Sequence, residues 1–136
     1  MSQENVKLAL KVTEAISRRD EEAFLACLSP DVQWEENTPI YAGLRRVYRG
    51  PEGARAWFNE ALLEFWDALQ AEVEETIEGP DDRVVVGALV RTRGKGSGAQ
   101  TELRLWAVVW VADGLIARRQ IFRDRDEALE AAGLSE

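Results

Sequence analysis

The stretch TELRLWAVVWVADGLIARRQIFR, residues 101–123, contains two apolar-rich runs joined by an Asp-Gly pair. Asp113 and Gly114 suit a two-residue type I′ turn, because both central residues of that turn need positive φ. This turn predicts a regular hairpin in which Ala112 faces Leu115. Since side chains alternate along a strand, the two faces of the hairpin follow from this register.

Neither predicted face of the hairpin is polar throughout. One face combines tryptophans with arginines and carries Arg104, Trp106, Val108, Trp110, Ala117, Arg119 and Ile121. The other face is mostly aliphatic and carries Leu103, Leu105, Ala107, Val109, Val111, Ile116, Arg118, Gln120 and Phe122. Because large apolar patches are rarely left in water, both faces are expected to be covered.

The composition is that of an ordinary globular protein, with 46% apolar and 31% charged residues in 136 positions. This length predicts a single domain spanning residues 1–136. The net charge of −8 argues against a nucleic-acid partner, because phosphate contacts need a basic surface. No early apolar run follows a basic start, and no stretch reaches membrane-spanning length, so we expect a cytoplasmic protein without a membrane partner.

Histidine is absent, which removes Ser-His dyads and most zinc-binding patterns. The single cysteine, Cys27, lies in an apolar run, where a buried inert thiol is expected in place of a nucleophile. We therefore predict no metal site and no cofactor.

The remaining elements follow from periodicity and from capping residues. Asp20 and Asp124 are good N-caps, Pro51 suits the first position of a helix, and Gly133 suits a helix stop. The predicted order is helix 5–18, helix 21–28, strand 32–36, loop 37–48, helix 51–68, strands 73–77 and 83–93, the hairpin strands, and a short final helix. This order predicts an α+β fold in which three helices from the N-terminal half pack on a curved antiparallel sheet.

Four short segments carry a resemblance to a known family: YRGPEG at 48–53, GKGSG at 94–98, DG at 113–114 and FRDRDEALEAAGL at 122–134. In this order they resemble the SnoaL-like proteins of the nuclear-transport-factor-2-like (NTF2-like) superfamily. The resemblance implies a cystatin-like cone with an internal pocket. It does not imply one reaction, because the superfamily includes polyketide cyclases, ketosteroid isomerases, epoxide hydrolases and proteins without activity.

The resemblance brings expectations for individual site residues. Glu36 matches the general base of the ketosteroid isomerases, but Val12 and Trp106 stand where their oxyanion donors would be. Arg104 matches the arginine of the limonene-epoxide hydrolases, while Trp106 and Ile121 replace the two acids of those enzymes. Both catalytic sets are therefore incomplete in this chain.

The site that remains is an aromatic pocket with arginines, suited to a planar ligand carrying a carbonyl, phenolate or carboxylate. Glu36 and Arg104 are the candidate catalytic residues. The candidate ligand-binding residues are Trp34, Tyr48, Trp57, Trp66, Trp106, Trp110, Arg119 and Ile121. In the alternative interpretation the tryptophans fill the core and Glu36 pairs with an arginine.

The predicted partners are a small hydrophobic or aromatic molecule and a second copy of the chain. A homodimer would form through the aliphatic outer face, with Leu103, Leu105, Val109, Val111 and Phe122, unless the last helix covers that face. Three function classes stay open. They are an isomerase- or cyclase-type enzyme acting on a ketone- or polyketide-like substrate, a non-catalytic ligand-binding protein, and a purely structural dimer.

Overall fold

The computed structural model describes residues 2–36 and 47–134, so most of the predicted loop 37–48 lies outside the described residues. The helices are α1 (Ser2–Arg18), α2 (Glu21–Ala26), α3 (Gly50–Trp57), the π-helix η2 (Phe58–Leu63) and α4 (Arg125–Ala131). The strands are β1 (Leu28–Glu35), β2 (Val47–Arg49), β3 (Trp66–Gly79), β4 (Arg83–Gly94), β5 (Gln100–Ala112) and β6 (Leu115–Phe122).

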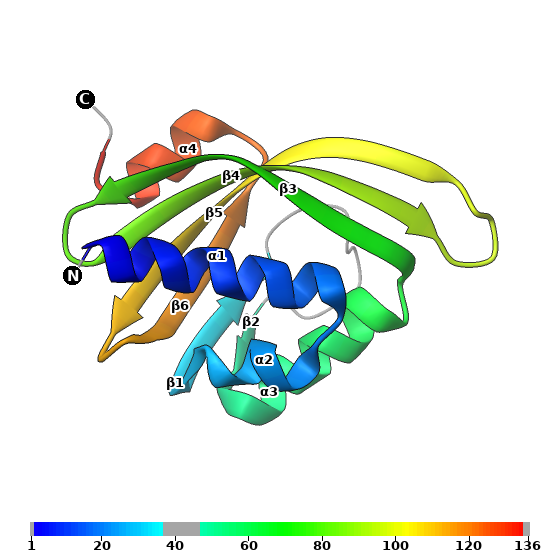
Figure 1. Ribbon diagram of the computed structural model, residues 1–136, viewed down its shortest axis with the longest axis horizontal. Helices are drawn as coiled ribbons and strands as arrows, with labels where there is room; N and C mark the ends of the chain where they lie inside the picture. Colours follow the sequence, from blue (N-terminus) through cyan, green and yellow to red (C-terminus); the bar gives the residue numbers. More distant parts are fainter. Residues whose placement is uncertain (1, 37–46, 135–136) are drawn as a thin grey trace.

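The strands form a six-stranded curved sheet in the order β2-β1-β6-β5-β4-β3, as Figure 1 shows. All neighbours are antiparallel except β1 and β6, which run parallel with Trp34 beside Arg119. The predicted α+β class is confirmed. The parallel pair joins segments that are far apart in the sequence, and it places β1 next to the final hairpin.

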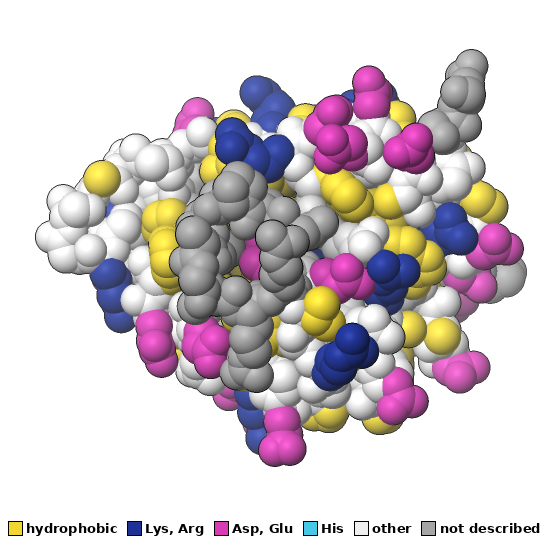
Figure 2. All heavy atoms as spheres, turned by 180° about the vertical axis from the view of Figure 1, so that it is seen from behind, with side chains coloured by type: hydrophobic (Ala, Val, Ile, Leu, Met, Phe, Trp, Pro, Cys, Tyr) yellow, Lys and Arg dark blue, Asp and Glu magenta, His cyan; other side chains and the backbone are white. Residues whose placement is uncertain are grey.

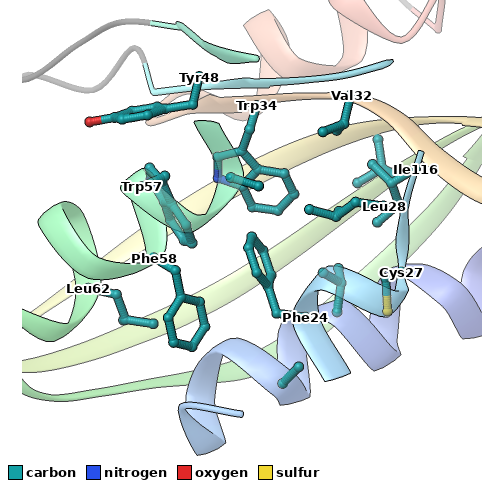
Figure 3. Close-up of a cluster of buried hydrophobic side chains, with 14 of the residues drawn as sticks. Phe24, Cys27, Leu28, Val32, Trp34, Tyr48, Trp57, Phe58, Leu62 and Ile116 are labelled. Atoms are coloured by element: carbon teal, nitrogen blue, oxygen red, sulfur yellow. The ribbon is translucent and has the colours of Figure 1, made fainter. Parts of the chain in front are cut away.

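The helices of the N-terminal half cover the concave face of the sheet, while α4 packs on the opposite face (Figure 1). The largest buried cluster combines Phe24 of α2, Trp34 of β1, Trp57 of α3 and Phe58 of η2 (Figure 3). In this cluster, the ring centroid of Phe24 lies 5.1–5.5 Å from those of Trp34, Trp57 and Phe58, and Trp34 and Trp57 lie 5.1 Å apart, at spacings typical of attractive aromatic pairs. Since burying one such side chain stabilises the fold by about 1.5–3 kcal/mol, this cluster holds helices and strand together.

The predicted helix 51–68 is too long. The α-helix ends at Trp57, the π-helix follows, and Trp66 already belongs to β3. The apolar residues of the segment 51–68 occur in adjacent pairs. Such pairs are compatible with a helix that buries a wide apolar face, but they do not show where the helix ends. The Arg19 Nη2 atom donates a 2.7 Å hydrogen bond to the Trp66 carbonyl, which fixes the start of the strand against the end of α1.

The predicted turn is confirmed, and the predicted register of the final hairpin is correct next to the turn, where Ala112 pairs with Leu115, but wrong from Trp110 onward. Asp113 and Gly114 have φ values of 53° and 77°, as a type I′ turn requires. Val111 pairs with Ile116, whereas Trp110 pairs with Arg118, so β6 contains one extra residue. Such a β-bulge rotates the following side chains to the other face of the strand.

The bulge therefore changes which side chains of β5 and β6 lie on the same face of the sheet. Arg119 pairs with Val109, and Ile121 pairs with Ala107, and these side chains point to the concave side. The surface predicted for a homodimer is therefore wrong: Leu103, Leu105 and Val109 line an internal cavity, Val111 lies in the main core, and Phe122 packs toward α4. Homodimerisation stays a prediction, but it would not occur through the surface that was predicted for it.

The convex face carries Trp106 and Trp110, two of the five tryptophans that were predicted to lie inside. The Trp106 indole crosses Gly87, where an added Cβ would lie 2.7 Å from its Nε1 atom. Its Nε1 atom donates to Glu75 Oε2 at 3.1 Å, and Arg125 of α4 binds the same carboxylate at 2.9 Å. The alternative prediction, that the last helix covers the outer face, is therefore correct for this part of the sheet.

Charged side chains also lie on that face. Arg91 pairs with Glu72 and Glu102, and Arg104 pairs with Glu74, each at 2.9 Å. Acidic and basic side chains are interspersed over the surface shown in Figure 2. Paired charges of this kind are well hydrated and contribute little stability individually.

Candidate functional site

A cavity of about 110 Å³ lies between the concave face of the sheet and helices α1 and α3. Its described walls are mainly aliphatic and aromatic: Val12, Thr13, Ile16, Trp34, Glu36, Trp57, Trp66, Leu69, Ala71, Val86, Ala88, Val90, Thr92, Leu103, Leu105, Ala107, Val109, Arg119 and Ile121. The volume is below the roughly 300–1,000 Å³ of most drug-sized ligand pockets. It is closer to the engineered cavity of about 150 Å³ that binds benzene.

The cavity differs between its two ends. At one end Glu36, Arg119 and their tryptophan neighbours are buried. At the other end, Trp66, Leu69 and Leu103 are half-exposed. We call the buried end, with Glu36 and Arg119, the closed end of the cavity.

Glu36 is the acidic group of the closed end. Its side chain is 4% exposed, and Oε1 accepts a hydrogen bond from Trp57 Nε1 at 3.0 Å. The same oxygen lies 3.4 Å from Arg119 Nη1. A buried carboxylate needs such donors, because desolvation of an unpaired charge is costly.

Arg119 is held from several sides at once. Nη1 donates to the backbone carbonyl of Glu35 at 2.7 Å, in addition to its contact with Glu36. The guanidinium carbon lies 4.4 Å from the ring centroid of Trp34 and 5.4 Å from that of Trp57. Cation–π contacts at these distances are attractive, so the arginine is fixed in place before any ligand arrives.

The local sequence explains how these groups meet. Val32, Trp34 and Glu36 alternate along β1 and its end, and all three are buried, as the period of the strand predicted. Because β6 runs beside β1, Arg119 lies next to Trp34. The closed end thus depends on the parallel strand pair, which joins segments too far apart in the sequence for a local pattern to predict.

The structure brings six of the ten predicted site residues to the cavity: Trp34, Glu36, Trp57, Trp66, Arg119 and Ile121. The other four lie elsewhere, and for them the predicted pocket position is wrong. Arg104 is exposed and binds Glu74, and Trp106 binds Glu75. Trp110 lies on the convex side, with Arg118 4.6 Å from its ring centroid. Tyr48 is buried, and its hydroxyl donates to Glu60 Oε1 at 3.3 Å.

Sequence reasoning missed the aliphatic walls of the cavity on α1, β3, β4 and β5. One signal could have identified them on β5: Glu102 and Arg104 share a face with Trp106, and two charges on an otherwise apolar strand favour solvent on that side. Leu103 and Leu105 would then have been placed inside.

Other chemistry is limited in the described part of the chain. Within residues 2–36 and 47–134, no three His, Cys, Asp or Glu side chains come close enough to hold a metal ion. Cys27 is buried, and burial raises the pKa of its thiol, so the reactive thiolate is disfavoured. None of the helices in those ranges has the length and apolar character needed to cross a membrane.

Solved structures with the same arrangement of elements are numerous. An NTF2-like protein of unknown function from Burkholderia pseudomallei is 25% identical, covers 97% of this chain and 98% of its own, and has a TM-score of 0.78. TerC, co-crystallised with polyporic acid, is 24% identical over 95% of this chain and 97% of its own, with a TM-score of 0.75. The Mycobacterium tuberculosis protein RV0760c, in complex with estradiol-17β-hemisuccinate, is 19% identical over 90% and 95%, with a TM-score of 0.76.

Comparison with curated proteins finds no match for this sequence. The SnoaL-like domain family, in contrast, matches residues 9–119, which is more than half of the chain. The match agrees with the curved sheet, the covering helices and the internal cavity, and the chain therefore belongs to the SnoaL-like domain family.

Proposed function

We propose that this protein binds a small, mostly apolar molecule that carries one polar oxygen, with that oxygen at the closed end of the cavity. The observation that carries the proposal is the buried pair of Glu36 and Arg119 at the end of an otherwise apolar cavity. Apolar walls supply the affinity for such a ligand, and a few fixed polar groups orient it. Ligands bound to the similar TerC and RV0760c support a small-molecule role.

The same two side chains could perform a proton transfer of the isomerase or cyclase type. Glu36 would accept a proton from the carbon next to a ketone, and the C–H electron pair would form an enolate. Arg119 would stabilise the enolate oxygen, since a fixed cation in an apolar site strongly favours developing negative charge. Return of the proton from Glu36 to the same or another carbon completes an exchange or an isomerisation.

One observation favours binding without catalysis as the second candidate. Glu36 Oε1 already lies within hydrogen-bonding distance of both Trp57 and Arg119. A carboxylate with these partners can serve to fix the arginine for the ligand. In that case Glu36 is a positioning residue and no proton leaves the bound molecule.

Deuterium exchange with cyclohexanone tests the proposal, because one ring is the size that the cavity suggests. Proton NMR in heavy water follows both binding, through line broadening, and loss of the protons beside the carbonyl. We expect the protein to accelerate this loss and Glu36→Gln to reduce the acceleration by about 10²–10⁴-fold, the usual contribution of a general base. Arg104→Gln, an arginine on the convex face, is the matched control and is expected to leave the exchange unchanged.

The outcomes separate the two candidates. Binding of the ketone without accelerated exchange would favour the non-catalytic protein. If cyclohexanone neither binds nor exchanges, the proposed function is contradicted. If Arg104→Gln lowers the exchange as much as Glu36→Gln, the site has been placed on the wrong side of the sheet.

A further inference from the structure

Three alanines, which we call the alanine line, give the floor of the cavity its direction. Ala107, Ala88 and Ala71 line the cavity from β5, β4 and β3. Ala107 lies opposite Val86, and Ala88 is the next inward residue of β4. Ala88 in turn lies opposite Val73, and Ala71 is the next inward residue of β3. Each step goes in the same direction along the strands, so the three short side chains form a diagonal across the sheet.

The same diagonal begins at the closed end of the cavity. Arg119 of β6 lies opposite Val109 of β5, and Ala107 is the next lining residue of β5. One diagonal step joins residues roughly 7–8 Å apart, so the three steps from Arg119 to Ala71 cover about 20 Å. A round cavity of 110 Å³ would be only about 6 Å across, although its volume is that of a small ring. The cavity is therefore long and narrow.

Larger aliphatic side chains flank the alanine line, and each lies opposite one of the alanines: Val86, Leu105 and Val90. Because an alanine side chain is shorter than those of valine and leucine, the floor of the cavity is lowest along the alanine line. A slender chain fits along such a floor. A branched or bulky ligand would have to displace the flanking side chains, and forcing extra atoms into a packed interior is unfavourable.

We infer that the cavity accepts an extended, unbranched carbon chain with its polar oxygen near one end, such as a methyl ketone of medium length. The inference rests on the proposed function and narrows its substrate class. With the oxygen beside Arg119, the carbon chain lies along the alanine line, where burial of each CH₂ group adds to the affinity. A chain with its oxygen in the middle has two arms, and only one of them can follow this line.

Two isomers test the shape of the ligand: 2-nonanone carries its carbonyl next to one end of the chain, and 5-nonanone carries it in the middle. They contain the same atoms and one ketone each, so their general hydrophobicity is nearly equal. Isothermal titration calorimetry with the wild-type protein measures both dissociation constants. We expect 2-nonanone to bind at least about tenfold more tightly than 5-nonanone. Affinities within about threefold of each other would overturn the inference.

One substitution is expected to separate a long ligand from a short one. Ala88→Leu fills the middle of the alanine line and should weaken the binding of 2-nonanone at least about tenfold. Benzamide, a single ring with a neutral carbonyl, reaches only as far as Ala107 when its oxygen lies beside Arg119. Its affinity should therefore stay within about threefold of the wild-type value.

Ala99→Leu, at an exposed position outside the cavity, is the matched control and should change neither affinity. Full affinity for 2-nonanone in a folded Ala88→Leu protein, or an equal loss for benzamide, would overturn the inference. If Ala88→Leu does not fold, the comparison of the two isomers in the wild-type protein decides it.

Failure of the proposed function gives a different result. If neither nonanone nor benzamide binds to the wild-type protein, the small-molecule proposal is wrong as a whole. If the two nonanones bind equally well, binding is supported and the preference for an extended chain is refuted.

Discussion

Trp34 and Trp57 are neighbours at the closed end of the cavity, with ring centroids 5.1 Å apart (Figure 3). Their indole nitrogens have different surroundings. Trp57 Nε1 donates to Glu36, whereas the buried Trp34 Nε1 has no hydrogen-bond partner among the described residues. Replacing each of the two indoles by a phenyl ring therefore changes a similar ring in both variants, but only the variant at Trp57 loses a hydrogen bond.

We predict that Trp57→Phe destabilises the protein more than Trp34→Phe. The first substitution removes a donor from a buried carboxylate, and hydrogen bonds to charged groups are worth about 1.5–3 kcal/mol. The difference in the free energy of unfolding should be about 1–2 kcal/mol, measured by urea denaturation of both variants. Equal losses would mean that the Trp57 hydrogen bond contributes nothing beyond packing.

Individual residues could be predicted from the sequence where a short-range pattern determines their direction. The alternation of Val32, Trp34 and Glu36 correctly indicated the inward side of β1. Arg119 was correctly expected in the pocket, but for a wrong reason, since the bulge and not the regular register turns it inward. Trp106 was misplaced because residue type does not show that an indole lies across Gly87 on the far side of the sheet.

Glu75 of β3 links the sheet to α4 through its hydrogen bonds with Arg125. Hydrogen bonds from Arg125 and, second, from Trp106 hold the pKa of this carboxyl below its usual range. A group whose pKa is lower in the folded state contributes stability above its unfolded pKa, and this contribution disappears as the pH falls through the folded pKa.

We predict that Glu75→Gln lowers the stability at pH 7 by no more than about 1 kcal/mol, because the ion pair is half-exposed. The difference from the wild type should shrink below about pH 4.3, the usual pKa of a glutamate, and vanish in stronger acid. Urea denaturation across this range measures it. Glu78→Gln, at an exposed glutamate of the same strand, is the control, and a difference that persists unchanged in acid would refute the role of Glu75.

The type and order of the helices and strands could be predicted from the sequence, but their first and last residues less well. The Asp113-Gly114 turn and the Asp124 cap carry local signals, and both are present in the structure. The β-bulge in β6 and the π-helix after Trp57 carry none, because ordinary residues occupy them and packing of distant segments decides them. The parallel pairing of β1 with β6 is likewise a property of the whole chain.

The cavity is a property of the whole molecule, since helices and sheet together leave it unfilled. Ala107 lies on its wall between Ile121 and Val86 in neighbouring strands. Natural proteins commonly keep such imperfect packing where function requires space.

We predict that Ala107→Leu removes ligand binding without unfolding the protein. The added carbons fill part of the cavity, so the gain in apolar burial and any overpacking nearly cancel, within about 1 kcal/mol. Benzamide affinity should fall at least about tenfold by calorimetry. Ala99→Leu, in the exposed connection between β4 and β5, should retain binding, and wild-type affinity in Ala107→Leu would show that benzamide binds elsewhere.

The pairing of β1 with β6 also has a consequence for biosynthesis. Arg119 follows Glu36 by 83 positions, so a ribosome adds it roughly 4–17 s later at usual elongation rates. During that interval the nascent chain contains Glu36 without Arg119. Since β6 lies between β1 and β5, β1 cannot join the rest of the sheet until the last strand has been translated.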